Sequence, residues 1–212
     1  MIPAIDASDL MLATHHRAPF SHENWIFELK YDGYRCLVRK FGSRVELISC
    51  QGKCMNRSFP DVVAALERVP GSFVWDAELT VDEPTGQSSF ERVQVRARTS
   101  VATRVRASMK LHPARLHMFD LLAAGARDLR ALSLIERKKR LVDTFEDTAV
   151  LICVTGTAAF GAQVFEQVGL HNFEGMVAKR IDSTYQAGRC RNWLKFKNAN
   201  YSRPAALDFG RL

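Results

Sequence analysis

Charged side chains recur inside segments that otherwise resemble apolar β-strands. FELKYDGYRC, residues 27–36, alternates apolar and charged residues and places Lys30 directly before a turn at Asp32-Gly33. Glu78 lies in VWDAEL, Glu174 in FEGMVAKR, and two further lysines in WLKFK. A lone charge on a strand usually lies on a solvated face. Burying an unpaired charge is costly, so the recurrence predicts charges that pair with one another or with a charged ligand.

The patterning predicts an α+β fold with mainly antiparallel sheets flanked by helices. About seven short strands are expected, and RCLVRKFGSRVELIS is expected to form a hairpin that turns at Gly42-Ser43. Three helices are expected: one opened by Pro60, one opened by a Ser133/Glu136 capping box, and one stopped at Gly169. A regular βαβ alternation is absent, which excludes a Rossmann unit. The 212 residues are expected to form one domain over positions 1–212.

The net charge of +7 and the pI of about 9.4 favour an anionic partner. Between Arg92 and Phe119 there is no acidic residue but seven cations: Arg92, Arg96, Arg98, Arg104, Arg106, Lys110 and Arg115. A second basic zone covers residues 179–197, where Asp182 is the only acid. Two such zones indicate binding of phosphate, most simply of nucleic acid.

The five cysteines are scattered, and no second pair or suitably spaced histidine completes a zinc site at Cys50 and Cys54. Reduced thiols in the cytoplasm are therefore expected. No stretch reaches the length needed to cross a membrane. The strand-borne cations and glutamates together suit a triphosphate with a divalent metal, since Mg²⁺ takes one or two carboxylates plus substrate phosphates.

These residues carry a specific resemblance. KYDGYR resembles the first motif, Lys-x-Asp-Gly-x-Arg, of the covalent nucleotidyltransferases, which comprise ATP-dependent DNA ligases, RNA ligases and capping enzymes. WDAEL, LHMFDLL, EGMVAKR and WLKFK follow in order and resemble the next four nucleotide-binding motifs. The stretch from the N-terminal LMLAT to YQAGRCRNWLKFK looks most like the bacterial end-joining type of ATP-dependent DNA ligase, so the resemblance covers about residues 10–198.

The resemblance implies a role for each matched residue. Lys30 would be the catalytic nucleophile that takes AMP from ATP, and its amine must be neutral to attack. Glu78 and Glu174 would hold Mg²⁺ or Mn²⁺. Further ATP contacts are implied at the adenine edge (Glu28, Leu29), the sugar (Arg35, Glu78), the base (Phe119) and the phosphates (Lys179, Lys195, Lys197). DNA phosphates are expected on the basic stretch at Arg96, Arg98, Arg104 and Arg106.

The sequence departs from the family pattern at three places. Ala77 stands where the family usually has glycine, and Cys50 stands where it usually has an arginine that contacts nucleic-acid phosphate. The fifteen residues after Lys197 are too few for the five-stranded OB-fold domain that normally follows. The expectation is a monomeric adenylation domain that acts on nicked DNA in repair or recombination, with an OB-fold or end-joining partner acting in trans.

Two alternatives remain open from the sequence. One is an RNA ligase or a capping-type guanylyltransferase, which shares the same motifs. The other is a non-catalytic nucleotide- or DNA-binding module, such as a decayed ligase remnant, which Cys50 and the missing OB-fold domain leave open.

Overall fold

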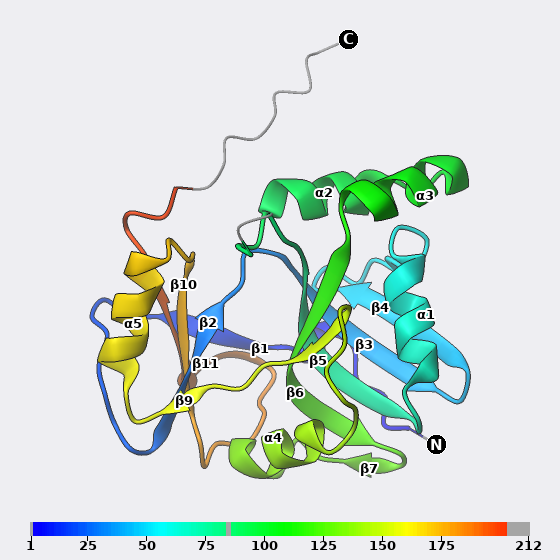
Figure 1. The fold of residues 1–212 in the computed structure, drawn as a ribbon. Helices are drawn as coiled ribbons and strands as arrows, with labels where there is room; N and C mark the ends of the chain where they lie inside the picture. The colour runs from blue at the N-terminus through cyan, green and yellow to red at the C-terminus, as the bar shows by residue number, and fades with distance from the viewer. Residues whose placement is uncertain (1, 84–85, 203–212) are drawn as a thin grey trace.

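The turn at Asp32-Gly33 carries the chain from one β-sheet into another. Before it lies β2 (Trp25–Lys30) in a five-stranded sheet, here called sheet A, and after it lies β3 (Tyr34–Phe41) in sheet B. The computed structural model describes residues 2–83 and 86–202. The two sheets lie beside each other, and the chain crosses between them from the end of β2 to the start of β3 (Figure 1).

Sheet A is built mainly from the C-terminal part of the chain. Its strands are, in spatial order, β1 (Met11–His15), β11 (Gly188–Lys197), β10 (Gly175–Arg180), β2 and β9 (Thr157–Ala158). Only the β1–β11 pair in this sheet is parallel. One face packs its apolar side chains against α5 (Gly161–Leu170), in a cluster of Phe27, Val168, Met176, Ala178 and Phe196.

Sheet B forms the larger core. Its strands are, in order, β4 (Arg44–Ser49), β3, β5 (Phe73–Val81), β6 (Ala114–Ala124) and β7 (Arg127–Asp128), and β8 (Leu151–Cys153) pairs in parallel with β6. The β3–β4 hairpin confirms the predicted turn, where Gly42 takes a positive φ of 58°. Ala77 is fully buried in the core of this sheet.

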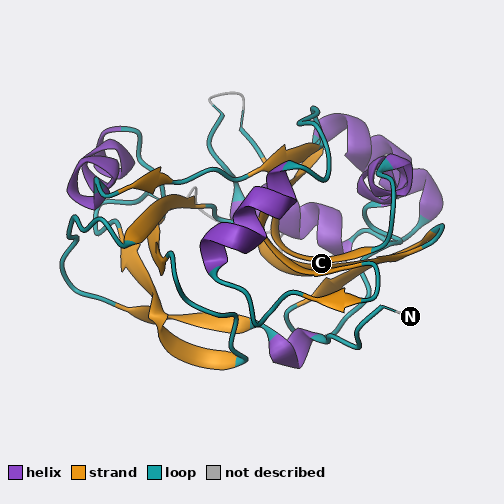
Figure 2. Ribbon diagram, turned by 90° about the horizontal axis from the view of Figure 1, so that it is seen from below, coloured by secondary structure: helices purple, strands orange, loops and turns teal. Residues whose placement is uncertain are grey.

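Helices flank the two sheets, as Figure 2 shows from below. The chain forms α1 (Pro60–Arg68), α2 (Phe90–Arg98), α3 (Ala102–Leu111), α4 (Leu134–Val142) and α5, after a short 3₁₀ helix at Ala7–Asp9. The three expected helices correspond to α1, α4 and α5, and the Ser133/Glu136 capping box is present. Near the middle of Figure 2, α4 crosses in front of the strands and packs against β6.

The α+β class is confirmed, and the architecture is richer than expected. The sequence did not predict β1, α2 or α3. The basic stretch from Arg92 onward lies largely in the two helices α2 and α3. Within residues 2–83 and 86–202, no helix has the length and apolar character to cross a membrane. A single domain over positions 1–212 stays a prediction, and residues 203–212, part of the segment judged too short for an OB fold, lie outside the described residues.

Candidate active site

One face of sheet A carries the charged residues of three sequence motifs. On β2, Glu28 and Lys30 share a face because side chains alternate along a strand. Their partners across the sheet continue that face, since Val177 lies opposite both Glu28 and Lys195, and Gly175 opposite both Lys30 and Lys197. Lys179 lies opposite Trp193 on the same face. The alternation seen in the sequence therefore gathers these cations and Glu28 on the side of sheet A opposite α5.

Sheet B supplies the facing wall. Arg35 on β3 lies opposite Glu78 on β5, and Phe119 projects from β6. Between the walls lies a cavity of about 410 Å³. Its lining brings together eight of the predicted nucleotide residues: Glu28, Leu29, Lys30, Arg35, Glu78, Phe119, Lys179 and Lys195. Lys197 is exposed at the end of the lysine-bearing face.

Lys30 forms an ion pair at the mouth of the site. Its Nζ lies 2.5 Å from Oε2 of Glu174, the residue that precedes β10. The Lys30 side chain keeps 26 % of its surface exposed and Glu174 keeps 11 %. Lys195 lies on the same face, where burial, together with the neighbouring cations Lys30, Lys197 and Arg189, lowers its pKa. This end of the cavity is therefore cationic, with one carboxylate in place.

Glu78 faces this cationic end from sheet B. Burial raises the pKa of Glu78 to about 8, and the nearby carboxylates Asp76 and Glu174 contribute in the same direction. Lys30 and Arg35 oppose the increase but do not cancel it. A carboxyl group with this pKa is largely protonated at neutral pH in the nucleotide-free protein.

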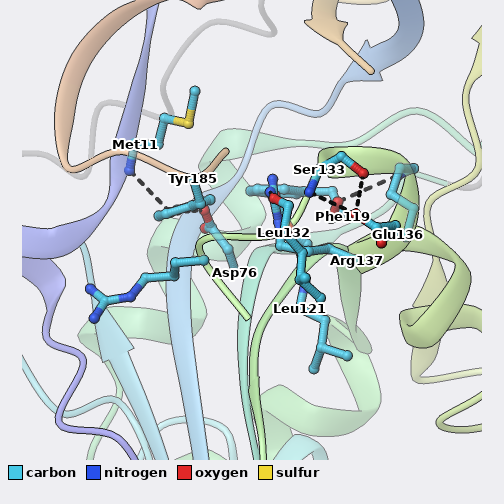
Figure 3. A network of polar contacts seen from close by, with 12 residues as sticks. Met11, Asp76, Phe119, Leu121, Leu132, Ser133, Glu136, Arg137 and Tyr185 are labelled. Atoms are coloured by element: carbon cyan, nitrogen blue, oxygen red, sulfur yellow. Dashed lines mark hydrogen bonds and ion pairs between the residues drawn. The ribbon is translucent and has the colours of Figure 1, made fainter. Parts of the chain in front are cut away.

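Arg35 is held in place by a buried network. Its guanidinium forms two hydrogen bonds to Asp76, at 2.6 and 3.0 Å, and one to the carbonyl of Met11. The Tyr185 hydroxyl donates to the same aspartate at 2.6 Å and accepts from the Met11 amide (Figure 3). The predicted contact of Arg35 with the sugar stays a prediction, but its orientation along the cavity wall is fixed by Asp76.

Lys179 lies away from the end of the cavity that holds Lys30, and the phosphate contact expected of it stays a prediction. Its Nζ is 2.6 Å from Oε2 of Glu28 and lies 4.2 Å above the Phe119 ring and 4.4 Å from the Trp193 ring. Along β10 it is four residues from Gly175, the partner of Lys30, which corresponds to about 13 Å. Lys179 therefore belongs with Glu28 and the aromatic rings.

The aromatic end of the cavity carries the expected base contacts. Phe119 is half-buried and lines the cavity, so stacking on a base stays a prediction that its position permits. The Leu29 side chain packs into the cluster on the opposite face, which leaves its backbone to line the cavity. Pairing of β2 with β9 reaches only to Phe27, so this strand edge borders the cavity.

Tyr31 and His117 stack beside the predicted nucleophile, with ring centroids 4.0 Å apart. Burial raises the pKa of Tyr31 to about 12 and lowers that of His117 to about 4, so both are neutral at physiological pH. His117 is also linked to Thr80 by a hydrogen bond of 3.1 Å. The stack holds the segment after Lys30 against β6.

The basic stretch divides into structural and exposed residues, and the expectation for Arg96 is wrong. Arg96 is fully buried, where it makes two hydrogen bonds to Asp61 and others to the carbonyls of Ser58 and His112. It holds helices together and cannot contact DNA from that position. The side chains of Arg98, Arg104 and Arg106 are exposed, so their role in DNA binding stays a prediction.

Sequence reasoning missed several residues that shape the site, including Lys138 on α4. Lys138 lies within the charged run ERKKR, a pattern that is typical of a solvated helix surface. In the structure the buried residues of α4 are Leu134, Arg137, Lys138 and Leu141. That is the i, i+3, i+4, i+7 spacing of a core-facing stripe, so the two leucines could have predicted that both cations are buried.

A family model for the ATP-dependent DNA ligase domain matches residues 11–197. The chain belongs to the ATP-dependent DNA ligase family. It is 35% identical over 193 residues to the multifunctional non-homologous end joining DNA repair protein LigD of Mycobacterium tuberculosis, a match that covers 90% of this chain and 24% of that protein. It is 29% identical over 193 residues to the SPbeta prophage-derived DNA ligase-like protein LigB of Bacillus subtilis, covering 91% and 68%.

Solved ligase structures share the fold. The ligase domain of M. tuberculosis LigD superposes with a TM-score of 0.77 at 31% identity, covering 92% of this chain and 60% of that one. A mycobacterial DNA ligase D complexed with ATP and MES gives the same TM-score and identity, covering 93% and 62%. The chain thus spans about a quarter of the LigD protein of M. tuberculosis. The predicted resemblance and the ligase class of enzyme are confirmed, while the roles of individual site residues stay predictions.

Proposed function

We propose that this ligase domain attaches AMP covalently to Lys30. The observation that carries the proposal is the place of Lys30 at the cationic end of a 410 Å³ cavity, 2.5 Å from Glu174. The cavity is chemically polarised, because Lys30 and Lys195 lie at one end while Phe119, Trp193 and the Glu28–Lys179 ion pair lie at the other. That polarity matches a nucleoside triphosphate whose phosphates lie at the lysines and whose base lies at the aromatic rings.

The reaction needs one bond made and one broken. The Lys30 amine, once it has lost a proton, donates its lone pair to the α-phosphorus of ATP. The bond between that phosphorus and the bridging oxygen breaks, and pyrophosphate leaves with the electron pair. Lys195 faces the developing phosphate charge from within the cavity, and Lys197 lies next on the same face.

The residues present suit a divalent cation that is shared with the nucleotide. Among residues 2–83 and 86–202, no three metal-ligating side chains gather into a protein-made metal site. Glu78 and Glu174 lie near each other and near Lys30, since both Glu174 and Lys30 affect the ionisation of Glu78. The two glutamates would hold Mg²⁺ or Mn²⁺ together with substrate phosphates, and the ion would neutralise phosphate charge.

The adenylated domain would then serve DNA joining. AMP would pass to a DNA 5′-phosphate before the 3′-hydroxyl closes the nick, and Arg98, Arg104 and Arg106 would hold the backbone. The LigD relatives are named as DNA repair proteins of non-homologous end joining, which supports a role in repair or recombination. We propose that a monomeric domain works with an OB-fold or end-joining partner. All five cysteines are unpaired, which fits a reducing compartment such as the cytoplasm.

The test is covalent labelling with α-labelled ATP and Mg²⁺, followed by denaturing electrophoresis. The wild type should acquire an acid-labile label, whereas γ-labelled ATP should give none. Lys30→Ala should abolish the label, and so should Lys30→Arg, because a guanidinium stays protonated. Lys110→Ala, an exposed lysine on α3, should label normally. A label that survives Lys30→Ala would refute the assignment, and competition by GTP equal to that by ATP would favour a guanylyltransferase instead.

A further inference from the structure

Lys138 lies outside the cavity lining, but its ammonium contacts Glu28, a residue of the site. It belongs to α4, which packs against β6 of sheet B, and only 7 % of its surface is exposed. Its Nζ lies 2.5 Å from Oε1 of Glu28, which is on sheet A. The same ammonium donates to the Val154 carbonyl at 2.8 Å and to the Phe119 carbonyl at 3.4 Å. Three partners around one ammonium fix its direction, so Lys138 ties Glu28 to the opposite wall.

Two buried lysines, Lys138 and Lys179, share Glu28 as their ion-pair partner. Lys138 binds one of its oxygens and Lys179 binds the other. Burial raises the pKa of Glu28, but the two lysines outweigh burial and leave that pKa below its ordinary value. Each carboxylate oxygen has lone pairs for a further hydrogen bond. Glu28 is therefore an ionised, immobilised acceptor that still lines the cavity.

Lys138 and Lys179 differ in their position relative to the cavity. Lys179 is part of the cavity lining and contacts the aromatic rings, whereas Lys138 lies behind Glu28 and does not line the cavity. Lys138 therefore acts on a bound nucleotide through the groups that it holds, chiefly the Glu28 carboxylate at 2.5 Å, while its contact with the Phe119 carbonyl is longer, at 3.4 Å. The base of a nucleotide whose phosphates lie near Lys30 would extend toward Phe119, and its edge would meet Glu28.

We propose that Lys138 is a positioning residue for base selection, which holds Glu28 as a fixed acceptor for the 6-amino group of the purine. A 6-amino group donates to a carboxylate, whereas the 6-oxo group of guanine or hypoxanthine presents an acceptor and meets repulsion. The inference rests on the adenylation function proposed above and names the contact that gives it base preference. It predicts that removing Lys138 weakens discrimination at position 6 of the base.

The test compares three nucleotides in the Lys30 labelling reaction. ATP carries the 6-amino group, purine riboside triphosphate carries hydrogen at that position, and ITP carries oxygen. Labelling rates at subsaturating nucleotide are measured for the wild type, Lys138→Met, Lys138→Gln, Glu28→Gln and the double variant Glu28→Gln/Lys138→Met. Lys138→Gln retains an N–H donor for the Val154 carbonyl. Lys139→Met removes the same charge from the next residue of α4, where the side chain is exposed, and serves as the matched control.

Both Lys138 variants should lose preference for ATP over purine riboside triphosphate by on the order of tenfold, as expected for one hydrogen bond to a charged group. The rate with purine riboside triphosphate should change by less than about threefold, and the preference for ATP over ITP should fall in parallel. Adding Lys138→Met to Glu28→Gln should cause no further loss of preference, because both changes remove the same hydrogen bond. Lys139→Met should behave as the wild type.

Equal losses with ATP and purine riboside triphosphate would show a general structural role and would overturn the inference. Loss of the native fold in both Lys138 variants would do the same, because Lys138 would then be a folding residue. Independent losses in the double variant would separate Lys138 from Glu28 and also contradict it. Failure of the proposed function is distinguishable, since the wild type would then label with none of the three nucleotides.

Discussion

The Lys30 ammonium and the Glu174 carboxylate are 2.5 Å apart although 144 residues separate them in the chain. Pairing of β2 with β10 places Gly175 opposite Lys30, and the residue before that glycine reaches the amine. The pair orients Lys30 toward the cavity. The same carboxylate is the one expected to hold a metal with the nucleotide. Glu174 would therefore pair with the Lys30 amine first and bind the metal and nucleotide afterwards.

Glu174→Gln should therefore impair chemistry far more than folding. We expect adenylation to fall at least about tenfold, the effect of losing one hydrogen bond to a charged group. The melting temperature should change by less than about 4 °C, since partly exposed ion pairs contribute at most about 1 kcal/mol. Glu166→Gln, an exposed residue on α5, is the control. A Glu174→Gln protein that labels at the wild-type rate would remove Glu174 from the site.

Glu78→Gln should change how stability depends on pH. The pKa of Glu78 is about 8 in the folded protein against an ordinary value of 4.5. The native state therefore binds a proton more tightly than the unfolded chain, and stability contributed at this group declines as pH rises from about 4.5 to 8. Glutamine cannot ionise, so the melting temperature of the variant relative to the wild type should rise across that window.

Melting curves at pH 5.5, 7.0 and 8.5 measure this difference. We expect a relative gain of roughly 6–12 °C between the extremes, equivalent to the ~3 kcal/mol that proton linkage gives for this pKa difference over these pH values. Glu67→Gln, on the exposed side of α1, should have a melting temperature whose difference from the wild type does not change with pH. A constant offset for Glu78→Gln as well would mean that Glu78 ionises normally in the native protein.

Reversing exposed charges on the basic helix α3 should weaken DNA binding without destabilising the fold. Arg104→Glu/Arg106→Glu reverses two exposed charges on α3 and should leave adenylation and melting temperature nearly unchanged. Affinity for nicked duplex should fall, and the slope of log affinity against log salt should decrease by about 0.9 for each DNA phosphate that the variant no longer neutralises. Fluorescence anisotropy at several salt concentrations measures both quantities, with Arg140→Glu on α4 as the control. An unchanged salt slope would place DNA on another surface.

Arg96→Gln, in contrast, should destabilise the fold. Arg96 is fully buried against Asp61, and removing one partner of a buried pair costs about 3–5 kcal/mol. The variant should melt at a much lower temperature. A folded Arg96→Gln protein that loses only DNA binding would restore the expectation drawn from the sequence.

More of the site than of the helical structure could be predicted from the sequence. Strands β2 and β11 alternate apolar and charged residues, so the face that bears Glu28, Lys30 and Lys195 could be predicted from period-two spacing alone. Helices α2 and α3 could not be predicted in this way, because each buries a single aliphatic side chain, Val93 or Val105, among arginines. Arg96 occupies a core position there, which hydrophobic periodicity treats as surface.

The contacts between the two sheets could not be predicted from the sequence, for a different reason. Which carboxylate meets which cation depends on how sheet A and sheet B face each other. Lys138, on a helix packed against sheet B, pairs with Glu28 of sheet A across 110 residues, and Arg35 of sheet B donates to the Met11 carbonyl of sheet A. Local patterning identifies the charged residues of each strand, but the sheet packing selects the pairs.

The glycine of KYDG is expected to be indispensable for steric reasons. A β-carbon on Gly33 would collide with the carbonyl oxygen of Leu79 and come within 3.0 Å of the Thr80 side chain and 3.1 Å of Glu78 Cγ. The backbone oxygen belongs to β5 in the middle of sheet B and has little room to move. Gly33→Ala should therefore displace the turn that joins β2 to β3, and Lys30 with it.

We expect Gly33→Ala to lose about 1–3 kcal/mol of stability, the usual cost of overpacking, and to label at least about tenfold more slowly because Lys30 leaves its alignment. Gly169→Ala is the matched control, since a β-carbon there meets nothing within 4 Å and lies within α5. That variant should gain roughly 0.5–1 kcal/mol from helix propensity and label normally. Chemical denaturation and the labelling assay measure both effects. If Gly33→Ala were as stable and active as the wild type, the close approach of the turn to β5 could not be what aligns Lys30.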